Sequence, residues 1–135
     1  MSRPPLTPIL TDVELSEQAS QVFADIRQTR QTEFINNFWR VLASDPAQLA
    51  RTWAEVRDVM APGELDPLVK ELIYIAVSTT NGCEYCIRSH SAAARARGAT
   101  DGMLAELRSV ITAAARTNSL ATGLQVPIDP EFLDG

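Results

Sequence analysis

The chain has 135 residues, of which 45% are hydrophobic and 21% are charged. This length and composition fit one folded domain and exclude a disordered chain. The formal net charge of −5 repels phosphate backbones and anionic lipids, so we expect neither nucleic acid nor a membrane as a partner. The longest apolar run, residues 72–77, is far shorter than the ~20 residues that span a bilayer. The N-terminus also lacks the apolar segment of a secretory signal, so we expect a cytoplasmic protein.

Helical periodicity dominates the chain after a proline-rich start. Apolar residues recur at intervals of three and four, and prolines, glycines and capping residues divide this pattern into six segments. The expected helices are residues 12–30, 34–42, 46–60, 67–79, 83–97 and a sixth that begins near residue 100. No segment indicates a strand. We therefore predict an all-α bundle of about six helices in a domain over residues 11–124, with an extended arm (1–10) and an irregular tail (125–135).

Two features of this pattern concern packing. The run over residues 72–77 is apolar on all sides, which predicts that the fourth helix is buried all round, partly by a neighbouring subunit. In the tail, Phe132 is the only large side chain that can anchor the segment to this subunit or to a neighbour.

Cys83-Glu-Tyr-Cys86 forms a C-x-x-C at the expected start of the fifth helix, after the turn Asn81-Gly82. One helical turn separates the sulfurs, so a disulfide can form and break with little movement of the backbone. In a reducing compartment such a pair indicates catalysis or metal binding more than architecture. Amides at a helix N-terminus stabilise a thiolate, so helix position favours the lower pKa for Cys83.

His90, the only histidine, follows Cys86 by four residues and Cys83 by seven, so all three side chains project from one side of the helix. An imidazole can take a proton from a thiol and return one to a leaving group near neutral pH. Glu71 lies in the preceding helix, twelve residues before Cys83. If the two helices pack as an antiparallel hairpin, Glu71 lies near His90 and can orient it or relay its proton.

Two other interpretations of these residues stay open. Two cysteines near an apolar helix can be inert packing residues. Cys83, Cys86 and His90 are also possible zinc ligands, but structural zinc takes four ligands and the chain has no third cysteine or second histidine. We therefore expect no metal and no cofactor.

Glu71, Cys83, Cys86 and His90, at this spacing, resemble the signature of the alkylhydroperoxidase D and carboxymuconolactone decarboxylase family. The segments Asn37-Phe-Trp-Arg-Val-Leu and Met60-Ala-Pro-Gly-Glu-Leu-Asp-Pro are similar to that family as well, so the resemblance covers roughly residues 15–115. It implies an all-α subunit that forms a homo-oligomer, a trimer or hexamer, with the dithiol near a subunit contact.

The resemblance also implies a reaction, the reduction of a hydroperoxide substrate. In it Cys86 attacks the peroxide, Cys83 resolves the sulfenic acid, and an external dithiol reductant restores the site. Glu71 and His90 relay the protons. The implied order of attack and the pKa order expected from helix position differ, so the attacking sulfur stays open.

One position departs from the family pattern. Some members carry a second histidine inside the C-x-x-C, where this chain has Tyr85. A phenol is not a base near neutral pH, so we expect weak peroxidase activity. A general dithiol–disulfide oxidoreductase and a redox-sensing helical assembly module stay as alternatives. Lactone decarboxylation is less favoured, because that reaction does not need a C-x-x-C.

Overall fold

The computed structural model describes residues 3–133, and these residues contain six α-helices and no β-strand. The helices are α1 (Glu17–Arg30), α2 (Asn37–Leu42), α3 (Pro46–Met60), α4 (Pro67–Asn81), α5 (Glu84–Ala96) and α6 (Asp101–Gly123). Two short 3-10 helices, η1 (Asp12–Glu14) and η2 (Pro130–Phe132), flank them. The all-α prediction is confirmed, and so is the position of the C-x-x-C at the start of the fifth helix.

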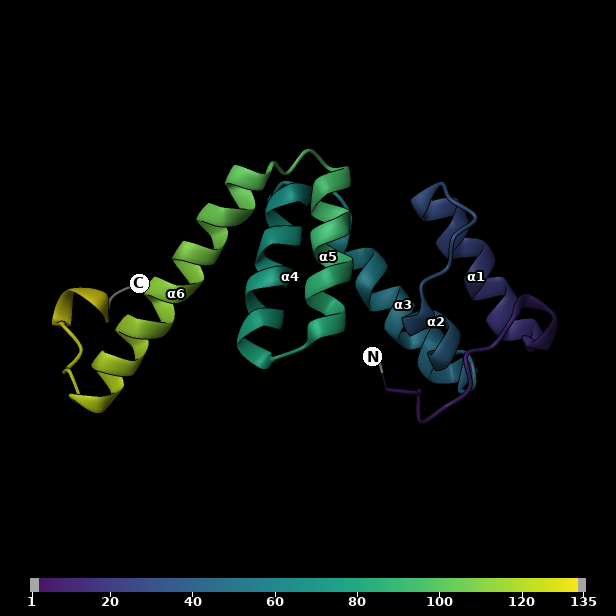
Figure 1. The fold of residues 1–135 in the computed structure, drawn as a ribbon, viewed down its shortest axis with the longest axis horizontal. Coiled ribbons are helices and arrows are strands. Elements are labelled where there is room, and N and C mark those ends of the chain that lie inside the picture. Colours follow the sequence, from purple (N-terminus) through teal and green to yellow (C-terminus); the bar gives the residue numbers. More distant parts are fainter. Residues whose placement is uncertain (1–2, 134–135) are drawn as a thin grey trace. The chain divides into compact units, whose positions relative to one another are not determined.

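The chain divides into two compact units, with the boundary between Ala61 and Pro62. The first unit contains α1 to α3 and the second contains α4 to α6 (Figure 1). In the first unit, Trp39 and Trp53 meet edge to face with ring centroids 5.5 Å apart, and Trp53 Nε1 donates a hydrogen bond to Asp25. The buried core of this unit is Ala19, Phe23, Ile26, Ile35, Trp39, Ala43, Leu49 and Trp53.

The first helix begins later than the expected residue 12. Ser16 is extended, and its hydroxyl accepts a hydrogen bond from the Ala19 amide at 3.1 Å. This bond satisfies an amide that the first turn leaves unpaired, so the serine caps α1 and Leu15 stays outside it. The residues before Leu15 form η1 instead, where Asp12 pairs with two arginines.

The second helix is shorter than the expected 34–42. The Thr32 hydroxyl accepts a hydrogen bond from the Phe34 amide at 3.2 Å, a local bond that holds this segment as a turn. Ile35 is buried ahead of α2, whereas Phe34 is 68% exposed. Within α2 the buried side chain is Trp39.

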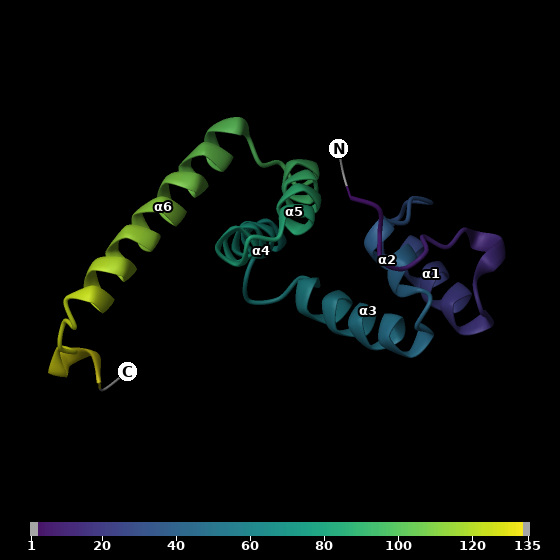
Figure 2. The same cartoon turned by 60° about the horizontal axis from the view of Figure 1, so that its bottom comes forward.

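In the second unit α4 and α5 lie side by side as a hairpin in both views (Figures 1 and 2). The core beneath them is Ile75, Ala94, Ala99 and Leu104, with Leu68, Leu72 and Leu107 packed against it. Helix α6 contributes its first turns to this core, and its outer length extends away from the hairpin (Figure 2). Val110 and Leu120 on that outer length are at least half exposed.

The chain by itself does not bury the fourth helix on every side, so the expected all-round burial would need a neighbouring subunit. Val69, Ile73 and Val77 recur every four residues and are each about half exposed. Glu71 and Ser78 are buried instead, because they lie on the face that the hairpin covers. One hairpin partner and the start of α6 are too few to cover an all-round apolar helix.

The two ends of the chain reach past the described residues. The expected arm and tail include residues 1–2 and 134–135, which lie outside the part that the structure describes. Within the tail, Phe132 belongs to η2 and is 75% exposed, so it does not anchor the tail to the described chain. Across residues 3–133, no helix is both long enough and apolar enough to cross a membrane.

Candidate active site

Helix caps and a tight turn position the site at the α4–α5 hairpin. The Asp66 carboxylate accepts a hydrogen bond from the Leu68 amide at 2.8 Å and so starts α4. Gly82 ends it in the left-handed region, with a φ of 72° that glycine adopts without steric cost. The Cys83 amide then donates to the Ser78 carbonyl at 2.9 Å. This turn makes Cys83 the N-cap of α5.

The two cysteines form a reduced, half-buried pair with unequal acidity. Cys83 Sγ accepts a hydrogen bond from the Cys86 amide at 3.4 Å, the place a capping oxygen usually takes. The Cys86 thiol and the amides of Cys86 and Tyr85 hydrogen-bond to the same sulfur and lower the pKa of Cys83. Burial, together with the Cys83 sulfur, raises the pKa of Cys86 to about 11. When one thiol of this pair ionises, the negative charge therefore lies on Cys83, as its helix position predicted.

This charge placement predicts the order of alkylation. At pH 7 a limiting amount of iodoacetamide is expected to modify Cys83 before Cys86, because only the thiolate reacts. Cys86→Ala removes the thiol donor, so it is expected to raise the pKa of Cys83 and slow its alkylation. Peptide mass spectrometry of samples quenched at short times measures both effects, with the urea-unfolded chain as the control. Faster modification of Cys86 in the wild type would contradict the placement.

A carboxylate–imidazole pair lies in the middle of the hairpin. His90 Nδ1 is 2.7 Å from Glu71 Oε2, and the two side chains are 17% and 6% exposed. The packing prediction for Glu71 is therefore confirmed. With Glu71 ionised, Nδ1 carries a proton and donates a hydrogen bond to the carboxylate, which leaves Nε2 to exchange protons with other groups. His90 follows Cys86 by one turn of α5, so the two side chains share a face.

Two further residues contact this pair. The Tyr74 ring is stacked on the imidazole of His90, with centroids 3.7 Å apart and planes inclined by 20°. Arg97 Nε is 3.6 Å from the other oxygen of Glu71, Oε1. A cation at this distance offsets part of the cost of burying the carboxylate. The sequence signals were weak: Tyr74 lies one turn after Glu71, and Arg97 lies two turns after His90.

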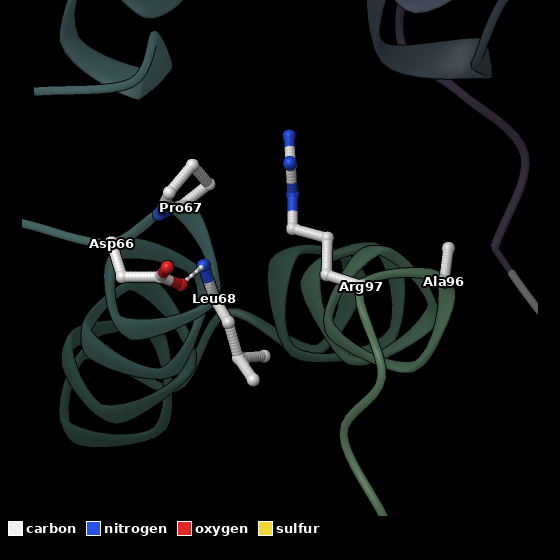
Figure 3. Close-up of a pocket in the computed structure, with 5 residues that line it drawn as sticks. All are labelled: Asp66, Pro67, Leu68, Ala96 and Arg97. Atoms are coloured by element: carbon white, nitrogen blue, oxygen red, sulfur yellow. Dashed lines mark hydrogen bonds between the residues drawn. The ribbon is translucent and has the colours of Figure 1, made fainter.

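Arg97 also lines an open pocket of about 380 Å³ at the end of the hairpin remote from the cysteines. Asp66, Pro67 and Leu68 at the start of α4 form one wall, and Ala96 and Arg97 at the end of α5 form the other (Figure 3). The guanidinium stands clear of α5 in this view, and the Asp66 carboxylate is bonded to the Leu68 amide. Arg97 therefore both lines the pocket and contacts Glu71 of the carboxylate–imidazole pair.

The site thus combines a thiol of lowered pKa, a half-buried thiol of raised pKa and a proton-exchanging pair on one hairpin. This set of groups suits dithiol–disulfide chemistry with proton transfer. Among the described residues, no three Cys, His, Asp or Glu side chains converge as a possible set of metal ligands. Residues 3–133 therefore contain no cluster of ligands for the zinc site that the sequence left open.

Fold and geometry together define a small all-α protein with a C-x-x-C dithiol and a part-buried carboxylate–imidazole pair on one helical hairpin. The model of the carboxymuconolactone decarboxylase family matches residues 47–129. The chain belongs to the carboxymuconolactone decarboxylase family, as the resemblance predicted.

Known relatives agree with this assignment. The crystal structure of the alkylhydroperoxidase AhpD core from Rhodospirillum rubrum is 51% identical, with a TM-score of 0.92 over 96% of this chain and 97% of that one. An uncharacterized protein of Cupriavidus necator is 30% identical over 62% of this chain and 74% of its own length. Uncharacterized protein 4 in the cox locus of Paracoccus denitrificans is 36% identical over 62% of this chain and 72% of its own length. The fold is thus the alkylhydroperoxidase AhpD fold.

Proposed function

We propose that the protein is a thiol-dependent peroxidase that reduces hydroperoxides through a dithiol–disulfide cycle of Cys83 and Cys86, with Glu71 and His90 as proton relay. The observation that carries this proposal is the hydrogen bond between the buried Glu71 and the half-buried His90, on the hairpin that also holds the dithiol. Inert cysteines need no proton relay, whereas cysteine redox chemistry moves protons at each step. The 51% identity to the alkylhydroperoxidase AhpD core supports the same class of reaction.

In the first step Cys86 attacks the peroxide. Its pKa of about 11 leaves it protonated at neutral pH, so the attack needs a base. His90, one turn away, takes the thiol proton at Nε2 while Glu71 holds Nδ1. The sulfur bonds to one peroxide oxygen and the O–O bond breaks. The leaving alkoxide receives the proton from His90 and departs as an alcohol, and Cys86 becomes a sulfenic acid.

In the second step Cys83 resolves the sulfenic acid. The lowered pKa of Cys83 makes its thiolate easier to form than that of Cys86. This thiolate attacks the Cys86 sulfur, the S–O bond breaks, and hydroxide leaves as water with a solvent proton delivered through His90. The lowered pKa of Cys83 also favours the opposite order of attack, with Cys83 first. The two orders differ in which serine variant still forms a sulfenic acid.

An external dithiol closes the cycle by thiol–disulfide exchange. One of its thiolates attacks the Cys83–Cys86 disulfide and forms a mixed disulfide with the protein. The second thiol of the reductant then attacks this mixed disulfide, which releases the reduced protein and leaves the reductant as a cyclic disulfide. Two electrons thereby pass from the reductant to the hydroperoxide in each turnover. Such a cycle requires a compartment that supplies reduced thiols, in agreement with the cytoplasmic location expected from the sequence.

A thiol titration tests this proposal. One equivalent of cumene hydroperoxide is expected to consume both thiols of the reduced protein and to leave an intramolecular disulfide, seen by mass spectrometry. With excess dithiothreitol the hydroperoxide is expected to be consumed catalytically. The variant with both Cys83 and Cys86 changed to alanine gives the background rate. Unchanged thiols, or a wild-type rate equal to this background, would overturn the proposal.

Other outcomes of this titration, together with assays of disulfide exchange and lactone consumption, favour the alternatives. If the thiols oxidise and no dithiol gives turnover, the redox-sensing assembly module is favoured. If the protein exchanges with disulfides and ignores hydroperoxide, it is a general dithiol–disulfide oxidoreductase. Lactone consumption that survives loss of both cysteines would identify a decarboxylase-type enzyme.

We further propose that the protein works as a homo-oligomer, a trimer or hexamer. The exposed apolar stripe of Val69, Ile73 and Val77 on α4, together with the exposed outer length of α6, supports this proposal. Sedimentation equilibrium measures the mass, and a value of one 14.8 kDa chain would contradict it.

A further inference from the structure

Tyr74 touches the proton relay and has no place in the cycle described so far. We propose that Tyr74 is a positioning residue for His90: its ring fixes the plane of the imidazole so that Nε2 keeps one orientation while Nδ1 is held by Glu71. The inference rests on the proposed peroxidase cycle, because it assigns Tyr74 a part in that relay. The structural observation behind the inference is the stack of the two rings, with centroids 3.7 Å apart and planes inclined by 20°.

A single hydrogen bond does not fix an imidazole. The 2.7 Å contact between Nδ1 and Glu71 Oε2 places one atom of the ring, and the ring can still tilt about that contact. A flat partner against the ring face prevents this tilt, because a tilt would drive ring atoms into the phenol. Glu71 and Tyr74 are one turn apart on α4, so both restraints come from the same helix face.

The stack also suits both charge states of the relay. A neutral imidazole stacks on the phenol ring as an apolar aromatic face. A protonated imidazole is a cation over an aromatic face, well within the ~6 Å at which such contacts are attractive. His90 can therefore accept and release a proton without losing its orientation. Both rings are half-buried, so this contact is partly shielded from water.

The composition of the chain makes the stack measurable. His90 is the only histidine, so its imidazole protons give one set of NMR resonances. The tyrosine ring current shifts these resonances upfield in the native protein relative to the urea-unfolded chain. Tyr74→Phe keeps the ring and is expected to keep the shift, whereas Tyr74→Met, of similar size, is expected to lose it. Tyr85→Met removes the other tyrosine and serves as the matched control for the resonance.

The functional readout is the rate of thiol oxidation by cumene hydroperoxide, alongside the rate of exchange with an aromatic disulfide. Tyr74→Met is expected to slow the peroxide step roughly two- to tenfold, the range that an aromatic pair contact is worth, and Tyr74→Phe is expected to restore it. Exchange with the aromatic disulfide through the Cys83 thiolate needs no base and is expected to change little. Circular dichroism establishes that each variant keeps its helices.

Three results would overturn the inference: a wild-type resonance that unfolding does not move, a Tyr74→Met resonance like the wild type, or a peroxide rate that Tyr74→Met leaves unchanged. If Tyr74→Met does not fold, the effect of unfolding on the wild-type resonance and the peroxide rate of Tyr74→Phe still test the inference. A Tyr74→Phe variant that reacts slowly with peroxide would assign the role to the hydroxyl and overturn the inference. Failure of the peroxidase proposal is separate, because wild-type protein would then show no peroxide-driven thiol loss at all.

Discussion

In Cys83→Ser, an organic hydroperoxide is expected to leave a sulfenic acid on Cys86 that accumulates, while turnover with dithiothreitol falls on the order of 10³-fold or more. The serine cannot resolve the sulfenic acid, so the first step proceeds and the cycle stops there. Dimedone labelling followed by peptide mass spectrometry locates and counts the sulfenic acid.

The reciprocal variant decides the order of attack. Cys86→Ser is expected to lose turnover by a similar factor and to form little dimedone adduct on Cys83. In this variant a serine hydroxyl replaces the Cys86 thiol, whose hydrogen bond is the first cause of the lowered pKa of Cys83, so Cys83 keeps a possible donor. A Cys83 adduct that forms at the wild-type rate of thiol loss would reverse the assignment and make Cys83 the attacking sulfur. Both variants need a reduced, folded starting state, which circular dichroism and thiol counts establish.

The second large effect concerns the proton relay. His90→Gln is expected to slow peroxide-driven thiol oxidation about 10²-fold, because a thiol with a pKa of about 11 then lacks its base. The loss is expected to shrink as the pH rises toward 11, because a growing fraction of Cys86 is then ionised without a base. Stopped-flow measurement of thiol loss across pH 6 to 10 tests this. A loss that is the same at every pH would contradict the role of His90 as base.

Glu71 is expected to act with His90 as a unit. Glu71→Gln keeps the size of the side chain and removes its charge, so it is expected to slow the same step at least about tenfold. The double variant is expected to be no slower than His90→Gln alone, since both changes disable one relay. Glu106→Gln removes an exposed carboxylate from α6 and is the matched control. Additive losses in the double variant would show that Glu71 acts independently of His90.

The ends of α3, α4 and α5 were predictable from the sequence to within two residues because each is marked by local signals. Asp45 and Asp66 cap their helices and are followed by proline, and Gly82 and Gly98 adopt positive φ where helices end. Such signals involve residues within one turn of the helix end, so they operate without knowledge of the tertiary fold. The shared face of the two cysteines and His90 follows from the same local geometry.

Contacts across the hairpin were less predictable. The spacing placed Glu71 near His90 once an antiparallel hairpin was assumed, because both residues lie about two to three turns from the connecting turn. The reach of Arg97 to Glu71 and the stack of Tyr74 depend on the distance between the helices and on side-chain rotamers. Neither the distance between the helices nor the rotamers can be predicted from the periodicity of the sequence.

The division of the chain also divides its spectroscopic probes. Both tryptophans lie in the first unit, whereas both tyrosines, both cysteines and the single histidine lie in the second. Tryptophan emission therefore reports directly on the core of α1 to α3. Tyrosine absorbance, the imidazole resonance and thiol accessibility report on the α4–α5 hairpin. Denaturation followed by these two groups of probes measures the two units separately, and any difference between their midpoints gives the degree to which they unfold independently.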